Sequence, residues 1–71
     1  MLKSLLRYRM ADKNIKDLTQ LIEVSGLSRT ALNKLYHNRD LDSLKLGTLE
    51  RLCNALGCDL TELVEFTRDS D

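Results

Sequence analysis

The sequence has no proline and no tryptophan, and only three of its 71 residues are aromatic. A chain of this length buries roughly 60% of the surface that its unfolded form would expose, which makes a marginal core. The length therefore excludes a second lobe, and we expect no large catalytic pocket. A compact helical fold or a dimer is the natural way to complete such a core.

Long apolar runs are also missing. Although 42% of the residues are hydrophobic, no apolar run exceeds two residues, as in Leu5-Leu6 or Leu63-Val64. Nothing in the sequence is thus long enough to span a membrane or to form the apolar region of a signal peptide. We expect a soluble cytoplasmic protein with no membrane partner.

Cysteine and histidine are scarce. Cys53 and Cys58 lack the second pair of ligands that a zinc site needs, so we expect reduced thiols, with Cys53 acting as a small hydrophobe rather than a redox or metal group. His37 has no recognisable Ser or Cys partner, and no glycine-rich phosphate loop exists. The sequence predicts no enzyme, no catalytic residue, no metal and no cofactor.

The formal net charge of zero conceals an asymmetry along the chain. Residues 1–39 carry eight bases and three acids, a net of +5, whereas residues 40–71 carry three bases and eight acids, a net of −5. If the halves of the sequence correspond to faces of the fold, a positive face can meet a phosphate backbone while an acidic face stays away from it or binds a partner.

Leucines and other apolar residues recur at helical spacing almost throughout the chain, and no segment alternates like a strand. Turn and cap residues divide this pattern: Asp17 with Gln20, Gly26, Ser28, Asn38, Gly57, and Asp59 with Glu62. We predict five helices, near residues 2–12, 18–25, 28–37, 46–56 and 60–66. Residues 1–67 form a single domain in this interpretation, and residues 68–71 form a frayed tail.

The segment from Leu18 to Tyr36 carries the functional signal. A helix is followed by a tight turn at Gly26, the apolar Leu27, and a helix whose Leu32 and Leu35 point inward. This is the helix-turn-helix pattern. The outer face of the second helix carries hydrogen-bonding and cationic side chains, namely Ser28, Arg29, Thr30, Asn33 and Lys34. Such a face suits the major groove, where Arg binds guanine and Asn binds adenine.

With these residues, and with the ending that runs from Leu49-Glu-Arg-Leu52 to Asp59-Leu60-Thr-Glu-Leu63, the sequence resembles the Xre/Cro family of lambda-repressor-like DNA-binding domains over nearly its whole length. The resemblance implies an all-α, five-helix bundle that binds operator DNA, usually as a dimer. It also implies that Arg29, Thr30, Asn33 and Lys34 face the bases.

The resemblance further places the start of the second helix close to a phosphate. Our predicted phosphate contacts are Ser28, Asp17, Thr19, Gln20, Tyr36 and Arg39. Ser28 can instead cap its helix, Tyr36 can form the rim of the core, and Arg39, like Lys16 and Lys45, can be an ordinary solvated charge. A predicted dimer interface contains Leu60, Leu63, Val64 and Phe66, because a seven-residue helix cannot bury all four internally.

Two positions depart from the family pattern. Ile22 stands four residues before the turn glycine, where the family usually has Ala, which predicts a wider helix crossing. Lys45 stands where a Ser or Thr often caps the fourth helix, so either Ser43 substitutes as the cap or that helix start frays.

Two classes of function remain after this reading. The first is a sequence-specific transcriptional regulator, more simply a repressor than an activator, which binds duplex DNA as a homodimer. The second is a protein-interaction module, for example an antitoxin-like or polymerase-contacting domain, which binds a protein partner through the acidic half. The cationic outer face around Arg29 and Lys34 favours DNA, since a protein-binding groove more often presents apolar anchors.

Overall fold

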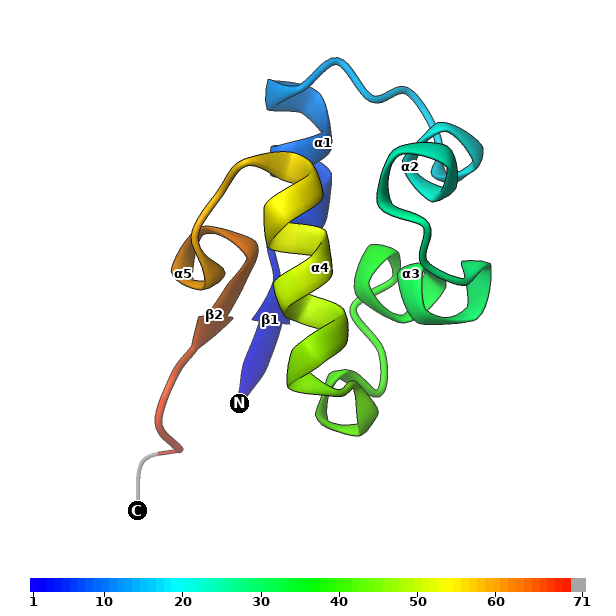
Figure 1. Cartoon of the computed structure of the whole chain (residues 1–71). Coiled ribbons are helices and arrows are strands. Elements are labelled where there is room, and N and C mark those ends of the chain that lie inside the picture. The colour runs from blue at the N-terminus through cyan, green and yellow to red at the C-terminus, as the bar shows by residue number, and fades with distance from the viewer. Residues whose placement is uncertain (70–71) are drawn as a thin grey trace.

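The computed structural model describes residues 1–69, which form a mostly helical domain with a small two-stranded sheet. The elements are β1 Leu2–Ser4, α1 Leu6–Asp12, α2 Leu18–Ser25, α3 Arg29–Tyr36, the 3-10 helix η1 Leu41–Ser43, α4 Leu46–Leu56, α5 Leu60–Leu63 and β2 Val64–Phe66. Helix α4 runs through the middle of the view, with α2 and α3 on one side and α5 and β2 on the other (Figure 1). Within residues 1–69, no helix is both long enough and apolar enough to cross a bilayer.

The core is built almost entirely from leucine. Each α-helix contributes at least one of the ten buried side chains, which are Leu6, Met10, Leu21, Leu27, Leu32, Leu35, Leu49, Leu52, Leu56 and Leu63. No polar side chain of the described residues is buried with them. Apolar burial is therefore the main term that holds the helices together, as the helical spacing of the leucines predicts.

The helix boundaries in the middle of the chain follow the predicted cap residues. Gly26 and Gly57 adopt left-handed backbone angles, with φ of 70° and 65°, and end α2 and α4. Asn38, with φ of 56°, follows the last turn of α3. The Glu62 carboxylate accepts a hydrogen bond from the backbone N–H of Asp59 at 2.9 Å, at the start of α5. Local chemistry thus determines these ends.

Helix α4 begins without the predicted substitute cap. Lys45 occupies the N-cap position, and no side chain hydrogen-bonds to this helix start. The hydroxyl of Ser43 donates instead to the carbonyl of Asp40 at 2.7 Å. Ser43 therefore does not replace the missing Ser or Thr cap.

The two ends of the chain differ from the prediction. Residues 2–4 and 64–66, expected to be helical, form the antiparallel strands β1 and β2, with Lys3 opposite Glu65 in the register. The prediction of helices over 2–12 and 60–66 without strands was wrong at these ends. The reason is that β1 and β2 satisfy each other's backbone groups across about sixty residues of sequence, which local periodicity does not report.

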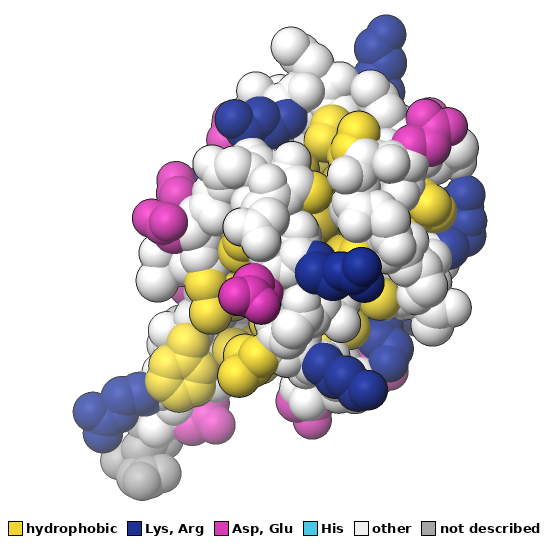
Figure 2. All heavy atoms as spheres, viewed as in Figure 1, with side chains coloured by type: hydrophobic (Ala, Val, Ile, Leu, Met, Phe, Trp, Pro, Cys, Tyr) yellow, Lys and Arg dark blue, Asp and Glu magenta, His cyan; other side chains and the backbone are white. Residues whose placement is uncertain are grey.

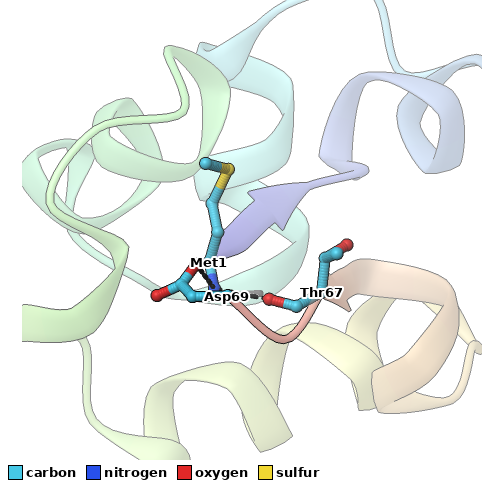
Figure 3. Close-up of polar contacts among 3 residues, drawn as sticks. All are labelled: Met1, Thr67 and Asp69. Carbon is cyan, nitrogen blue, oxygen red and sulfur yellow. Dashed lines mark hydrogen bonds and ion pairs between the residues drawn. The ribbon is translucent and has the colours of Figure 1, made fainter. Parts of the chain in front are cut away.

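Hydrogen bonds beyond the sheet continue the pairing of the two ends (Figure 3). The amino group of Met1 donates to the carbonyl of Thr67 at 2.7 Å and lies 3.4 Å from the Asp69 carboxylate. The Leu5 N–H donates to the carbonyl of Leu63 at 2.8 Å. Of the tail predicted over 68–71, residues 70–71 lie outside the described part of the chain.

The four residues predicted for a dimer interface do not share one environment. Leu63 is fully buried in the core, so its assignment to an exposed interface was wrong, and Val64 is half-buried. Leu60 and Phe66 are exposed, at 43% and 67%. They line an apolar groove with Leu2, Val64 and Leu46, and hydrophobic side chains gather in this part of the molecule in the space-filling view (Figure 2).

Replacing Leu63 and Leu60 separately tests this distinction. Leu63→Ala should lower the free energy of unfolding by about 2–5 kcal/mol, because it leaves a cavity in the core. Leu60→Ala, at the rim of the groove, should lower it by about 1 kcal/mol or less. Urea unfolding followed by circular dichroism measures both, and equal losses would contradict the assignment of Leu63 to the core.

Candidate nucleic-acid interface

Side-chain caps fix the geometry of the α2–turn–α3 unit. The Asp17 carboxylate accepts a hydrogen bond from the Gln20 N–H at 2.9 Å and caps α2. The Ser28 hydroxyl accepts one from the Ala31 N–H at 3.2 Å and caps α3. Between them, the Ser25 hydroxyl accepts a hydrogen bond from the Leu27 N–H at 3.2 Å. The turn therefore has a defined conformation that sets where α3 begins.

Leucines on the inner face hold the two helices together. Leu21 of α2, Leu27 of the turn, and Leu32 and Leu35 of α3 are all buried in the common core. Ile22 is half-buried and packs against this core, so the larger residue is accommodated at the position where the family usually has Ala. With this inner face buried, the opposite face of α3 is turned outward.

The predicted base-reading residues lie on that outer face in two environments. Arg29 and Thr30, in the first turn of α3, are exposed, whereas Asn33 and Lys34, one turn later, are half-buried. The first turn of α3 is therefore the part most open to a ligand.

Arg29 is linked to the preceding helix. Its terminal Nη2 donates a hydrogen bond to the Thr19 hydroxyl of α2 at 3.0 Å. This contact joins a predicted base-reading residue to a predicted phosphate-contacting residue. Because a guanidinium has five N–H donors in a planar arrangement, the bond to Thr19 orients Arg29 while leaving donors for another acceptor.

Lys34 is linked to the connection between α3 and α4. Its Nζ donates to the Ser43 hydroxyl at 2.8 Å, and that hydroxyl donates in turn to the carbonyl of Asp40 at 2.7 Å. Asp40 has a left-handed backbone, with φ of 50°. Lys34 therefore ties α3 to η1, a contact that the sequence pattern does not predict.

The other residues predicted to contact phosphate lie in separate places. Asp17 and Gln20 are exposed at the start of α2, where the Gln20 side chain accepts from the Lys16 N–H at 3.0 Å rather than from the Asp17 N–H that a capping box requires. Arg39 is exposed in the connection after α3. Only Thr19 is joined directly to the outer face of α3, through Arg29.

Tyr36 lies away from this outer face and packs against α1. The Arg7 guanidinium carbon lies 4.4 Å from the centroid of the Tyr36 ring, and Arg7 Nε donates to the carbonyl of Tyr36 at 3.1 Å. The His37 ring meets the Tyr36 ring edge to face, with centroids 5.2 Å apart. Sequence reasoning missed Arg7, because a contact across 29 positions has no local signal.

The two cysteines are free thiols that pack against the core from the end of α4 and the turn after it. Burial raises the pKa of the Cys53 thiol to about 11, and the adjacent Cys58 thiol contributes to the rise. A thiol with a raised pKa is a poor nucleophile at neutral pH. The packing of Cys53 against the core agrees with the prediction of a small hydrophobe.

This geometry, a capped helix, a glycine turn and a second helix with a polar outer face, defines a helix-turn-helix DNA-binding domain. The chain belongs to the family of Cro/C1-type HTH DNA-binding domains, whose model matches residues 5–69. The predicted family and fold class are thereby confirmed, and the family is one of DNA-binding rather than enzymatic domains. Searches of curated proteins and of solved structures found no match.

Substitution of Ser28 separates its capping role from a contact with phosphate. Ser28→Ala should lower the free energy of unfolding by about 1 kcal/mol, because the N–H of Ala31 loses its acceptor. Ser28→Asp restores the cap but adds a negative charge beside the predicted backbone contact. Thermal unfolding and duplex binding are measured for both variants. A Ser28→Asp protein that is stable and binds DNA as tightly as the wild type would contradict a phosphate near Ser28.

Proposed function

We propose that this chain is a sequence-specific transcriptional regulator that binds operator DNA as a dimer and represses by occupying a promoter. The observation that carries the proposal is the first turn of α3, where Arg29 and Thr30 are exposed directly after a capped helix-turn-helix turn. We place this activity in the cytoplasm.

In this proposal Arg29 and Asn33 make the sequence-specific contacts. An Arg guanidinium binds the O6 and N7 atoms of guanine, and an Asn amide binds the N6 and N7 atoms of adenine. Each good pair discriminates against a wrong base by about 1–3 kcal/mol. The hydrogen bond from Arg29 to Thr19 supports this role, because it restricts the guanidinium before DNA arrives. Thr30 adds a hydroxyl and a methyl group that can contact thymine.

Lys34 has a different role from Arg29 in the proposal. Its ammonium is engaged by Ser43, so it keeps only part of its hydrogen-bonding capacity for a base. It places positive charge where α3 meets the connection that carries Arg39. We assign Lys34, Arg39, Ser28 and the start of α2 with Asp17, Thr19 and Gln20 to the side of the interface that meets the phosphate backbone.

The apolar groove beside β2 supports dimerisation. It has a volume of about 320 Å³ and is lined by leucines of η1, α4 and α5 together with Leu2, Val64 and Phe66. Phe66 and Leu46 are 67% and 75% exposed at its rim. We propose a two-fold dimer in which Leu60, Val64 and Phe66 lie at the centre of the interface between the two copies. Such a dimer would place its two α3 helices on half-sites one DNA turn apart, about 34 Å.

A protein-interaction module is the second candidate, and the apolar character of the same groove favours it. Asp42 is the only charged residue that lines the apolar groove among residues 1–69. An amphipathic helix from a protein partner could occupy such a surface. The outcome of DNA selection separates this candidate from the first.

Selection of bound sequences from a random duplex pool tests the main proposal. The wild type should enrich an inverted repeat, and the double variant Arg29→Ala/Asn33→Ala should lose the enrichment while keeping its fold. Arg51→Ala/Asn54→Ala is the matched control, since both residues are exposed on α4. No enrichment by the wild type, or equal retention by all three proteins, would favour the protein-interaction module.

Light scattering tests the dimer. The wild type should show a dimer mass at micromolar concentration or on DNA, and Phe66→Ser should weaken association by about tenfold or more, because it removes the largest exposed apolar group from the groove. Val24→Ser is the control, as Val24 is 53% exposed on α2 and does not line the groove. A monomer mass at high micromolar concentration with DNA present would rule out the dimer.

A further inference from the structure

Five surface clefts of residues 1–69 differ in the charged side chains that line them. Two clefts and the apolar groove, all bordered by η1, α4 or α5, contain acids and no Lys or Arg; these acids are Asp40, Asp42, Glu50 and Asp59. Two clefts beside α1 contain bases and no Asp or Glu; these bases are Lys3, Arg7 and Lys16. Basic side chains therefore gather beside α1, and the cleft that contains Asp40 and Asp42 adjoins them at Asn38, which lines both.

The two basic clefts form one surface. Arg7 and Tyr36 line both of them, so the larger cleft of about 460 Å³ and the smaller one of about 160 Å³ meet at this pair. We call this surface the α1–α3 cleft; its cationic and aromatic residues are Lys3, Arg7, Tyr8, Lys16, Tyr36 and His37. It extends from β1 to Lys16, immediately before the N-cap of α2.

Arg7 is arranged to bind an anion at the centre of this cleft. The Tyr36 ring and carbonyl hold one side of the guanidinium, at 4.4 Å and 3.1 Å. Within residues 1–69, no carboxylate lies within ion-pair distance of Arg7, Lys3 or Lys16. Glu65, the partner of Lys3 across the sheet, does not line the cleft. The terminal N–H groups of Arg7 thus remain available in a fixed plane, the geometry that suits a phosphate.

The length of α3 relates this cleft to bound DNA. Its eight residues span about 12 Å, which is close to the width of the major groove. If α3 crosses the major groove with Arg29 and Thr30 on the bases, its C-terminal end at Tyr36 and His37 reaches the edge of the groove, where the phosphates lie. The α1–α3 cleft opens at that end of the helix.

We propose that the α1–α3 cleft is a phosphate-binding site that holds the DNA backbone beside the groove read by α3. Arg7, placed by Tyr36, binds a phosphate at its centre, and Lys16 and Lys3 neutralise the phosphates on either side. This inference rests on the proposed function, because it requires α3 to lie in the major groove.

The salt dependence of binding tests the site, using the full chain and a fluorescent duplex recovered from the selection. The logarithm of the affinity falls as the logarithm of the salt concentration rises. Lys16→Ala and Lys3→Ala should each make this dependence shallower, by about one in the magnitude of the slope. Each should also weaken binding about fivefold at 0.15 M salt. Arg7→Gln should act in the same direction, with its melting temperature measured separately because it also loses the contact with Tyr36. The control is Lys13→Ala, another exposed lysine of this segment, whose Nζ lies near Gly57 and outside the cleft.

The outcomes distinguish failure of this site from failure of the proposed function. The site is supported if the salt dependence is shallower for Lys16→Ala and Lys3→Ala than for Lys13→Ala, with the selected DNA sequence unchanged. If the slopes equal that of Lys13→Ala, the phosphate site is overturned, but the proposal that α3 recognises the bases is not affected. A wild-type chain that binds no duplex overturns both.

Discussion

The burial of Leu27 directly after the left-handed turn at Gly26 is the constraint on which the rest of this structure depends. Gly26 reverses the chain without strain, and Leu27 enters the core between α2 and α3. Leu32 and Leu35 then have to face inward, so Arg29 and Thr30 have to face outward. A change in the turn would rotate the polar face of α3, and with it every contact that this face makes with a ligand.

The positions of the charged side chains, rather than the net charge of the chain, determine how this domain can interact with a polyanion. The chain is formally neutral, yet Lys3 and Arg7 line a cleft beside α1, and Glu50 and Asp59 line one beside α4 and α5. Because exposed charges are screened within about 8 Å at physiological salt, a polyanion at one surface is little affected by acids more than this distance away. Neutrality is therefore compatible with a nucleic-acid partner.

The sequence predicts those parts of the fold that are determined by residues close to one another along the chain. The ends of α2 and α3 follow from Asp17, Gly26 and Ser28, whose hydrogen bonds or backbone angles act within a few positions. Contacts between distant segments were not predicted, because they depend on the assembled fold: the pairing of β1 with β2, the bond from Lys34 to Ser43, and the stacking of Arg7 on Tyr36. For the same reason Leu63 was assigned to a dimer interface, although the assembled fold buries it in the core.

The sheet that joins the two ends of the chain has a consequence for the order in which the domain opens. Closing a loop of about sixty residues costs more entropy than forming a helical turn, so we expect this pairing to form late in folding and to open early in local unfolding. Residues of this same sheet, Leu2, Val64 and Phe66, line the apolar groove. A second copy bound there would hold the strands closed, so that protein concentration would control how often the ends of the chain separate.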